Sequence, residues 1–400
     1  MKKILPAIIG LGYVGLPVFI SLKKKFKVIG FDTNKERVTN LNHQTDTNNE
    51  FSKNELKLLN KSLITNKKEY LKKCNFFIIT VPTPINKNNL PDLKYIISAF
   101  KTISKYIKKN DIIFLESTVF PGTTEKICKN IIKKNNNVKF HIGYSSERIN
   151  PGDKIHNIKN ISKVVSIKSN KNIISIVKKV YDSISKKIIF SENIKEAELS
   201  KLIENTQRDL NIALMNEIMI LCYKTNLDFN EVIRLARSKW NFLKFNPGLV
   251  GGHCLPVDPY YLSYYANKSK FKTKVTLAGR NVNNSMETFI FEKINKKVLK
   301  VKKNKNKKIV VAGLTYKANV ADLRNSLAIK IFKKLKYKVP NIMAYDPTIE
   351  KRLAKKLNIE IDFENIKNAD IFIFLVKHNK FKNIYLYAKK NNKTIFDPFF

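Results

Sequence analysis

The sequence element that most constrains the fold is a glycine-rich turn near the start of the chain. Residues 4–9 are followed by Gly10, Gly12 and Gly15 in the spacing Gly-x-Gly-x-x-Gly, and an uncharged stretch continues to Leu22. A strand, this turn and a helix form the phosphate-binding part of a dinucleotide site: the first glycine permits the turn, the second admits the pyrophosphate, and the third lets helix and strand pack. The phosphates then lie at a helix N-terminus.

Asp32 ends the next predicted strand, residues 27–32. A carboxylate there would bind the adenosine ribose hydroxyls and repel a 2′-phosphate, so the predicted cofactor is NAD rather than NADP. The alternative interpretation is a glycine turn beside a surface aspartate. Pro6 conflicts with a central strand, because it lacks a backbone N–H, and we expect it at the strand's first residue.

Further apolar runs alternate with helical segments, which is typical of a doubly wound parallel sheet. A long helical pattern follows the first set of strands, and a polar linker at 302–308 precedes a second set. The sequence therefore predicts an α/β protein with two Rossmann-like doubly wound domains joined by a central helical segment. The expected domains are 1–190, 191–300 and 301–400. The other predicted strands are 75–81, 111–116, 139–144, 309–313, 342–346 and 371–376, and the long helix is 194–223.

The net charge of +44 raises the possibility of a nucleic-acid or membrane partner. The excess is mostly lysine scattered among Asn and Ile, a composition that an A/T-rich genome also produces. We therefore expect no specific nucleic acid and no membrane partner. Four cysteines without CxxC spacing predict no metal site and no disulfide framework, and favour a cytoplasmic protein. The N-terminal apolar stretch lacks a cleavage site and is predicted to be structure rather than a signal peptide.

Cys254 lies in the run Gly-Gly-His-Cys-Leu-Pro-Val-Asp, residues 251–258. A thiol flanked by glycines, with Asp258 four residues on, favours a nucleophile over a packed cysteine. His253 is expected to shape the loop. A reactive thiol combined with a nicotinamide site indicates oxidation of an aldehyde through a thioester.

Lys201, Asn205 and Arg208 fall on one face of the long helix. A solvated charged face is the usual explanation. The apolar neighbouring face and the uncharged amide instead favour a buried polar cluster with a function.

Seven segments in order match one known family. They are GLGYVGLP (10–17), VPTP (81–84), ESTVFPGTTE (116–125), SERINPG (146–152), KLIENTQRDLNIALMNE (201–217), PGLVGGHCLPVDPYYL (247–262) and GLTYKANVADLRNS (313–326). The chain resembles the UDP-glucose/GDP-mannose dehydrogenase family over nearly its whole length. Arg148 and the 201–217 helix are more similar to the branch acting on UDP-N-acetylhexosamines.

The resemblance implies an NAD-binding domain, a central domain for dimerisation and the catalytic loop, a C-terminal UDP-sugar-binding domain and a homodimer. It implies oxidation of C6 of a UDP-N-acetylhexosamine (UDP-GlcNAc or UDP-GalNAc) to a carboxylate with two NAD+. The implied catalytic residues are Cys254, Lys201, Asn205, Asp258, Glu147 and Thr118. The implied cofactor contacts are Gly10, Gly12, Tyr13, Val14, Gly15, Asp32, Arg37, Thr83, Thr118 and Arg324. The implied substrate contacts are Arg148, Ile149, Lys201, Asn205, Arg208, Gly251, Tyr316 and Lys317.

Two alternatives stay open at this point. One is a UDP-glucose or UDP-ManNAc 6-dehydrogenase. The other is a non-catalytic nucleotide-sugar or nucleic-acid binder, which the charge suggests and the intact set of Cys254, Lys201, Asn205 and Asp258 opposes.

Overall fold

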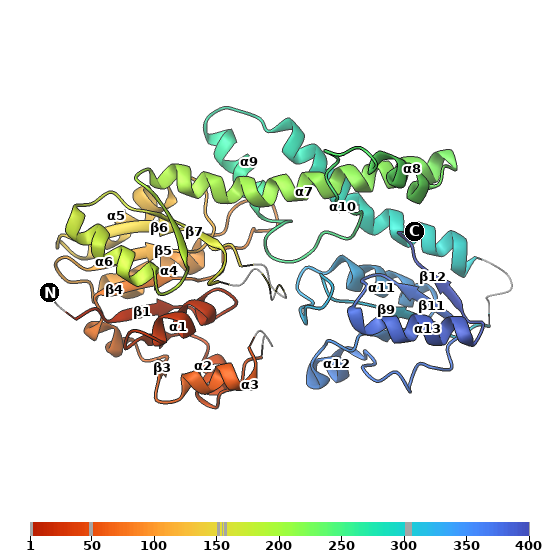
Figure 1. Ribbon diagram of the computed structural model, residues 1–400, viewed down its shortest axis with the longest axis horizontal. Coiled ribbons are helices and arrows are strands. Elements are labelled where there is room, and N and C mark those ends of the chain that lie inside the picture. Colours follow the sequence, from red (N-terminus) through yellow and green to blue (C-terminus); the bar gives the residue numbers. More distant parts are fainter. Residues whose placement is uncertain are drawn as a thin grey trace. The chain divides into compact units, whose positions relative to one another are not determined.

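The computed structural model describes residues 3–47, 51–149, 153, 155, 158–300 and 306–399. The chain divides into two compact units, one formed by 1–204 with 260–272 and the other by 205–259 with 273–400. Figure 1 shows two sheet-containing parts and the long helix α7, Ile194–Thr225, whose sequence contributes to both units.

The first unit contains an eight-stranded sheet with the order β3-β2-β1-β4-β5-β6-β7-β8. Its neighbours pair in parallel except β6 and β7, which pair antiparallel. The strands are β1 Pro6–Ile9, β2 Ile29–Phe31, β3 Leu63–Thr65, β4 Phe76–Ile79, β5 Ile112–Leu115, β6 His141–Ser145, β7 Ser162–Ser166 and β8 Lys187–Ser191. The helices are α1 Gly15–Lys23, α2 Lys35–Asn42, α3 Lys53–Leu56, α4 Lys94–Ser104, α5 Lys129–Asn135 and α6 Lys171–Tyr181.

Alternate side chains of these strands enter two separate cores. Ile8, Ile78 and Phe114 pack with residues of α1 and α6, whereas Ile9, Phe77 and others pack with residues of α4 and the segment around α5. Because both faces are covered, the central strands are apolar throughout, as the sequence predicted. Pro6 is the first residue of β1.

The second unit contains a four-stranded parallel sheet with the order β10-β9-β11-β12. The strands are β9 Ile309–Ala312, β10 Met343–Tyr345, β11 Ile371–Phe374 and β12 Thr394–Phe396. The helices are α8 Phe229–Ala236, α10 Lys274–Ile294, α11 Leu327–Lys338, α12 Lys351–Leu357 and α13 Lys382–Lys390. Helix α9, Asp258–Lys268, begins in this unit and continues in the first.

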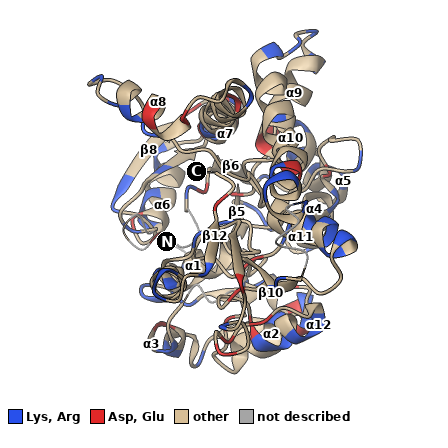
Figure 2. Cartoon of the chain, turned by 90° about the vertical axis from the view of Figure 1, so that its right-hand side faces the viewer, with Lys and Arg blue, Asp and Glu red and all other residues tan. Residues whose placement is uncertain are grey.

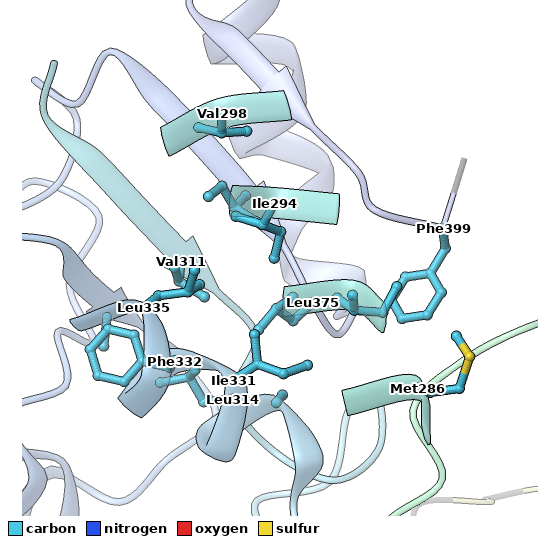
Figure 3. Close-up of a cluster of buried hydrophobic side chains, with 14 of the residues drawn as sticks. Met286, Ile294, Val298, Val311, Leu314, Ile331, Phe332, Leu335, Leu375 and Phe399 are labelled. Atoms are coloured by element: carbon cyan, nitrogen blue, oxygen red, sulfur yellow. The ribbon is translucent and has the colours of Figure 1, made fainter. Parts of the chain in front are cut away.

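Figure 3 shows the larger core of the second unit, where Met286 and Ile294 of α10 lie with Val311 of β9 and Phe332 of α11. The opposite face of the sheet packs on α13, through residues such as Phe372 and Ile384. The predicted fold class is confirmed: two doubly wound α/β parts accompany a long helix.

The expected strands all form, within about two residues of their predicted ends. Four strands (β3, β7, β8 and β12) were not predicted, and neither was the antiparallel pairing of β6 with β7. Lysine and arginine are spread over many helices (Figure 2). In the described part of the chain, no helix combines the length and apolarity needed to span a bilayer.

Candidate active site

The glycine turn after β1 has the backbone geometry of a dinucleotide site. Gly10 has φ +93°, and its N–H donates to Phe31 O (2.8 Å). A Cβ on Gly15 would lie 1.8 Å from Gly10 O, so any side chain would separate α1 from the turn. A Cβ on Gly12 would meet no atom within 4 Å, so the second glycine faces space that a pyrophosphate needs. These residues therefore fit NAD. Tyr13 and Val14 complete the turn.

Asp32 follows β2 and faces the same turn. Its Oδ2 accepts from Leu11 N (2.8 Å) and its Oδ1 from Asn34 N (2.9 Å). Each carboxylate oxygen retains a further lone pair, which a ribose hydroxyl can use.

Arg37 lies on α2, and its side chain contacts the glycine turn. Its Nε donates to Leu11 O (2.8 Å), and its Nη1 donates to Asp46 Oδ1 (2.7 Å). The side chain is buried, and Nη2 has no hydrogen-bond partner. The structure thus gives Arg37 a positioning role beside the predicted contact with NAD.

Two loops after neighbouring strands carry the predicted threonines Thr83 and Thr118, and both side chains are half-buried. Ser117 Oγ donates to Val81 O (2.7 Å), which links the loop after β5 to the loop after β4. Tyr261 OH of α9 donates to Pro84 O (3.1 Å). The carboxyl ends of β4 and β5 are therefore held together at the edge where doubly wound sheets bind ligands.

Glu147 follows β6 and is nearly buried within a charged network. Its Oε1 accepts from Arg148 N and Ile149 N (both 2.7 Å), and Lys163 Nζ donates to its Oε2 (2.9 Å). Burial acts to raise the pKa of Glu147, but the Lys163 charge and the two backbone amides outweigh it and hold the pKa below its usual value. Glu147 is therefore ionised at neutral pH.

The Arg148 side chain turns away from Glu147. Its Nη1 donates to Ser162 O (3.2 Å), and its Nη2 pairs with Glu204 Oε1 of α7. Lys201, one turn before Glu204, is buried on the same helix, while Arg208 is exposed. Of the three predicted residues on α7, Lys201 is therefore buried, Asn205 half-buried and Arg208 exposed.

In the second unit, Asn205 and Asp258 are brought together. Asn205 Nδ2 donates to Asp258 Oδ2 (2.5 Å). Asp258 begins α9, and its N–H donates to Cys254 O (2.8 Å). Asp258 therefore links Asn205 to the end of the loop that holds Cys254. Cys254 is exposed, whereas Cys74, Cys128 and Cys222 are buried.

The glycines before Cys254 serve close packing against the segment after β9. A Cβ on Gly251 would lie 2.6 Å from Asn325 O, and one on Gly252, where φ is +91°, would lie 2.7 Å from the Tyr316 ring. Asn325 Nδ2 also donates to Gly252 O (3.0 Å). The loop therefore leans directly on Tyr316; its neighbour Lys317 is half-buried.

His253 and Arg324 converge on Asp322. His253 Nε2 lies 2.9 Å from Asp322 Oδ2, and the Arg324 guanidinium makes a fork on both carboxylate oxygens (Nη2 to Oδ2, 2.8 Å). Burial opposes ionisation of Asp322, but His253 and Arg324 together hold its pKa well below the usual value. The carboxylate thus ties the cysteine loop to the predicted diphosphate-binding Arg324.

Three side chains that shape the candidate site were not predicted from the sequence: Lys163, Asp322 and Glu198. Glu198 of α7 accepts from Gly122 N (2.5 Å) and Thr124 N (2.9 Å), which anchors the loop after Thr118. Asp322 lies inside one of the matching segments, a signal that was available. Lys163 carried no signal, because its partners follow other strands.

Relatives match the chain over nearly its whole length. Protein CapL of Staphylococcus aureus is 43% identical over 98% of this chain and 94% of its own. UDP-N-acetyl-D-glucosamine 6-dehydrogenase of Salmonella typhi is 41% identical over 94% of this chain and 91% of its own. The solved structure of UDP-D-ManNAc dehydrogenase from Pyrococcus horikoshii is 30% identical, covers 98% of this chain and 95% of that chain, and has a TM-score of 0.83.

Three family models match in succession. Residues 3–185 match the NAD binding domain of the UDP-glucose/GDP-mannose dehydrogenase family, residues 195–285 its central domain, and residues 310–399 its UDP binding domain. The glycine turn, Asp32 and the cysteine loop lie within these matches. The chain therefore belongs to the UDP-glucose/GDP-mannose dehydrogenase family and is an NAD-dependent UDP-sugar dehydrogenase.

Proposed function

We propose that the protein oxidises C6 of a UDP-N-acetylhexosamine, UDP-GlcNAc or UDP-GalNAc, to the uronic acid in two successive two-electron steps. The observation that carries the chemistry is the hydrogen bond from Asn205 to Asp258, which joins the predicted helix residue to the loop holding the exposed Cys254. The Salmonella relative, 41% identical and named for UDP-N-acetyl-D-glucosamine, supports the sugar.

A second substrate, UDP-N-acetylmannosamine, has its own support. The structure from Pyrococcus horikoshii carries that name at 30% identity and similar coverage. UDP-GlcNAc and UDP-ManNAc both carry an N-acetyl group and differ in configuration at one ring carbon. Higher identity to the glucosamine enzyme makes UDP-GlcNAc the first substrate to test.

Cys254 would be the nucleophile of the second oxidation. The first oxidation would remove a hydride and a proton from the C6 alcohol and leave an aldehyde. The Cys254 thiolate would then add to the aldehyde carbon to give a thiohemiacetal, loss of a second hydride and of the hydroxyl proton would give a thioester, and water would cleave it to the carboxylate and the free thiol. Each of the two hydrides would go to its own NAD+, two NAD+ in total, held in turn by the residues of the glycine turn. Burial raises the pKa of Cys74 to about 12, which leaves that thiol unreactive.

Lys201 and Asn205 would stabilise the oxyanion that forms on the C6 oxygen. An amide nitrogen carries two N–H groups, and Asn205 uses one on Asp258. The second can donate to the oxyanion while Asp258 fixes the rotamer. A donor held this way is worth about 3 kcal/mol in comparable sites. Thr118, Glu147 and Asp258 would handle water and protons.

The remaining predicted residues would hold the two ligands. Tyr13, Val14, Asp32, Arg37, Thr83 and Thr118 would contact NAD, together with the three glycines of the turn. Arg148, Ile149, Arg208, Gly251, Tyr316 and Lys317 would contact the UDP-sugar, and Arg324 the diphosphate. Residues 1–190, 191–300 and 301–400 would serve as the NAD, central and UDP-sugar domains.

We also propose a homodimer built on the central segment. Leu214 and Leu221 of α7 are half exposed, and Trp240, after α8, is 92% exposed. Large apolar side chains exposed in such number favour burial against a second copy. Sedimentation at several concentrations tests this, with a monomer at micromolar protein contradicting it.

The activity is tested by incubating the protein with NAD+ and single UDP-sugars and counting NADH per sugar consumed. We expect two NADH per UDP-GlcNAc or UDP-GalNAc, with a UDP-uronic acid as product. Turnover restricted to UDP-ManNAc or UDP-glucose would overturn the substrate assignment. One NADH per sugar, with aldehyde accumulating, would overturn the thioester route.

A further inference from the structure

A buried charged network in the first unit connects β7 and α6 with the segments that follow β5 and β6. Lys163 Nζ of β7 donates to Glu116 Oε2 and Glu147 Oε2 (both 2.9 Å), and Tyr181 OH of α6 donates to Glu116 Oε1 (2.9 Å). All four side chains are at least nine-tenths buried. Two carboxylates therefore share one ammonium group away from solvent.

This arrangement is costly for a purely structural element. Buried ion pairs contribute little net stability, and a second carboxylate on the same ammonium adds repulsion. Burial and the Glu147 charge raise the pKa of Glu116, whereas the pKa of Glu147 is held below its usual value. The two carboxylates are pushed apart in acidity, a pattern that marks functional sites.

The difference between the two carboxylates arises from their hydrogen bonds. Glu147 Oε1 accepts two backbone N–H groups in addition to the Lys163 contact of Oε2, whereas Glu116 accepts one phenol hydroxyl instead. The other nearby charge, Arg148, is directed to Ser162 O and Glu204. Lys163 is thus the only described cation that an ion pair joins to Glu147.

We propose that Lys163 is a positioning residue for the reaction: it holds the Glu147 carboxylate ionised and in one orientation, while Glu116 and Tyr181 hold the Lys163 ammonium in place. This rests on the proposed function of Glu147 in moving protons. Lys163 acts through Glu147 and does not touch substrate. Without the ammonium, Glu147 keeps its backbone hydrogen bonds but loses the positive charge that favours its ionised form against the effect of burial.

The test is the pH profile of kcat/KM for the intact enzyme with its UDP-sugar. Lys163→Met keeps most of the length of the side chain and removes the charge, so the acid limb should move to higher pH by about 1–3 units, as expected for loss of a close opposite charge. Lys163→Arg, which keeps the positive charge, should leave the acid limb close to its wild-type position. Lys187→Met, an exposed lysine on β8, is the matched control and should leave the profile unchanged.

The opposite change provides an independent check. Glu116→Gln removes the competing carboxylate and should leave the acid limb in place or move it to lower pH. NAD affinity, measured by fluorescence titration, should stay within about twofold in every variant, because the glycine turn lies on other strands. Should Lys163→Met fail to fold, Lys163→Gln combined with Glu116→Gln carries the same expectation as Lys163→Met.

Glu147→Gln distinguishes the proton-transfer role of Glu147 from the positioning role of Lys163. Full activity in Glu147→Gln would remove Glu147 from the proposed function. Loss of activity in Glu147→Gln together with a wild-type acid limb in folded Lys163→Met would leave that function standing and overturn the positioning role of Lys163. An upward shift in Glu116→Gln would overturn it as well.

Discussion

The side-chain amide of Asn216 forms two hydrogen bonds with the backbone of Gly248. Gly248 N donates to Asn216 Oδ1 (2.8 Å), and Asn216 Nδ2 donates to Gly248 O (3.1 Å). Asn216 lies fully buried on α7 and also donates to Asn283 of α10 (2.8 Å). One amide therefore fixes the start of the loop that ends in Cys254.

Replacing Asn216 by Ala should lower kcat by roughly 10- to 100-fold, because small displacements of a reacting group are expensive. It also removes the partner of two half-buried backbone groups of Gly248, at a cost of about 1 kcal/mol in the free energy of unfolding. Steady-state kinetics and urea unfolding measure both. Asn211→Ala, whose amide caps only a carbonyl of its own helix, is the control. Equal effects in both variants would contradict the loop-fixing role.

Replacing Cys254 by Ala should abolish acid formation, because the second oxidation needs the covalent adduct. Product analysis by mass spectrometry measures this. The control variant Cys222→Ala, which changes a buried cysteine, should still produce the acid, although its folded state should be less stable. Full acid production by Cys254→Ala would show that the reaction does not need a thioester on Cys254.

Admission of the pyrophosphate at Gly12 and close packing at Gly15 are separable by substitution. Gly12→Ala places its methyl in open space, so stability should hold while NAD affinity falls roughly tenfold or more, the effect of about 1.4 kcal/mol. Gly15→Ala places a methyl 1.8 Å from Gly10 O and should cost about 1–3 kcal/mol in the free energy of unfolding. Fluorescence titration with NAD and thermal unfolding distinguish the two. Unchanged NAD affinity in a folded Gly12→Ala protein would contradict the site.

Glu198 should make stability depend on pH. Burial raises its pKa from 4.5 to about 7, so the folded state binds the proton more tightly than the unfolded state between these values. Stability contributed by the protonated group is then fully present below pH 4.5 and is lost as pH rises to about 7, by about 3 kcal/mol in total.

Urea unfolding at pH 5 and pH 8 measures this loss against Glu198→Gln, in which the group cannot ionise. We expect the wild type to lose stability relative to the variant between the two values. A difference that stays constant with pH would show that Glu198 does not titrate in this range. Glu196 of the same helix, where the Asn193 amide contacts it at the surface, supplies the control Glu196→Gln.

The sequence by itself determined the local elements and their chemistry. Continuous apolar runs such as 76–79 are read directly as buried parallel strands, and the glycine spacing specifies the turn, because both depend on neighbours within a few residues. The residue types at Cys254 and Asp258 predicted a thioester route, which stays a prediction. Motif spacing along α7 placed Asn205 correctly on the helix but did not show its partner.

Only the tertiary structure decided which distant side chains meet. Lys163 joins Glu116 and Glu147 because β7 returns antiparallel beside β6, a pairing between strands separated by a long connection. The glycines before Cys254 are needed for the Tyr316 ring and the Asn325 carbonyl, more than sixty residues further along. Burial and charge at such contacts depend on packing between segments, which periodicity within one segment does not encode.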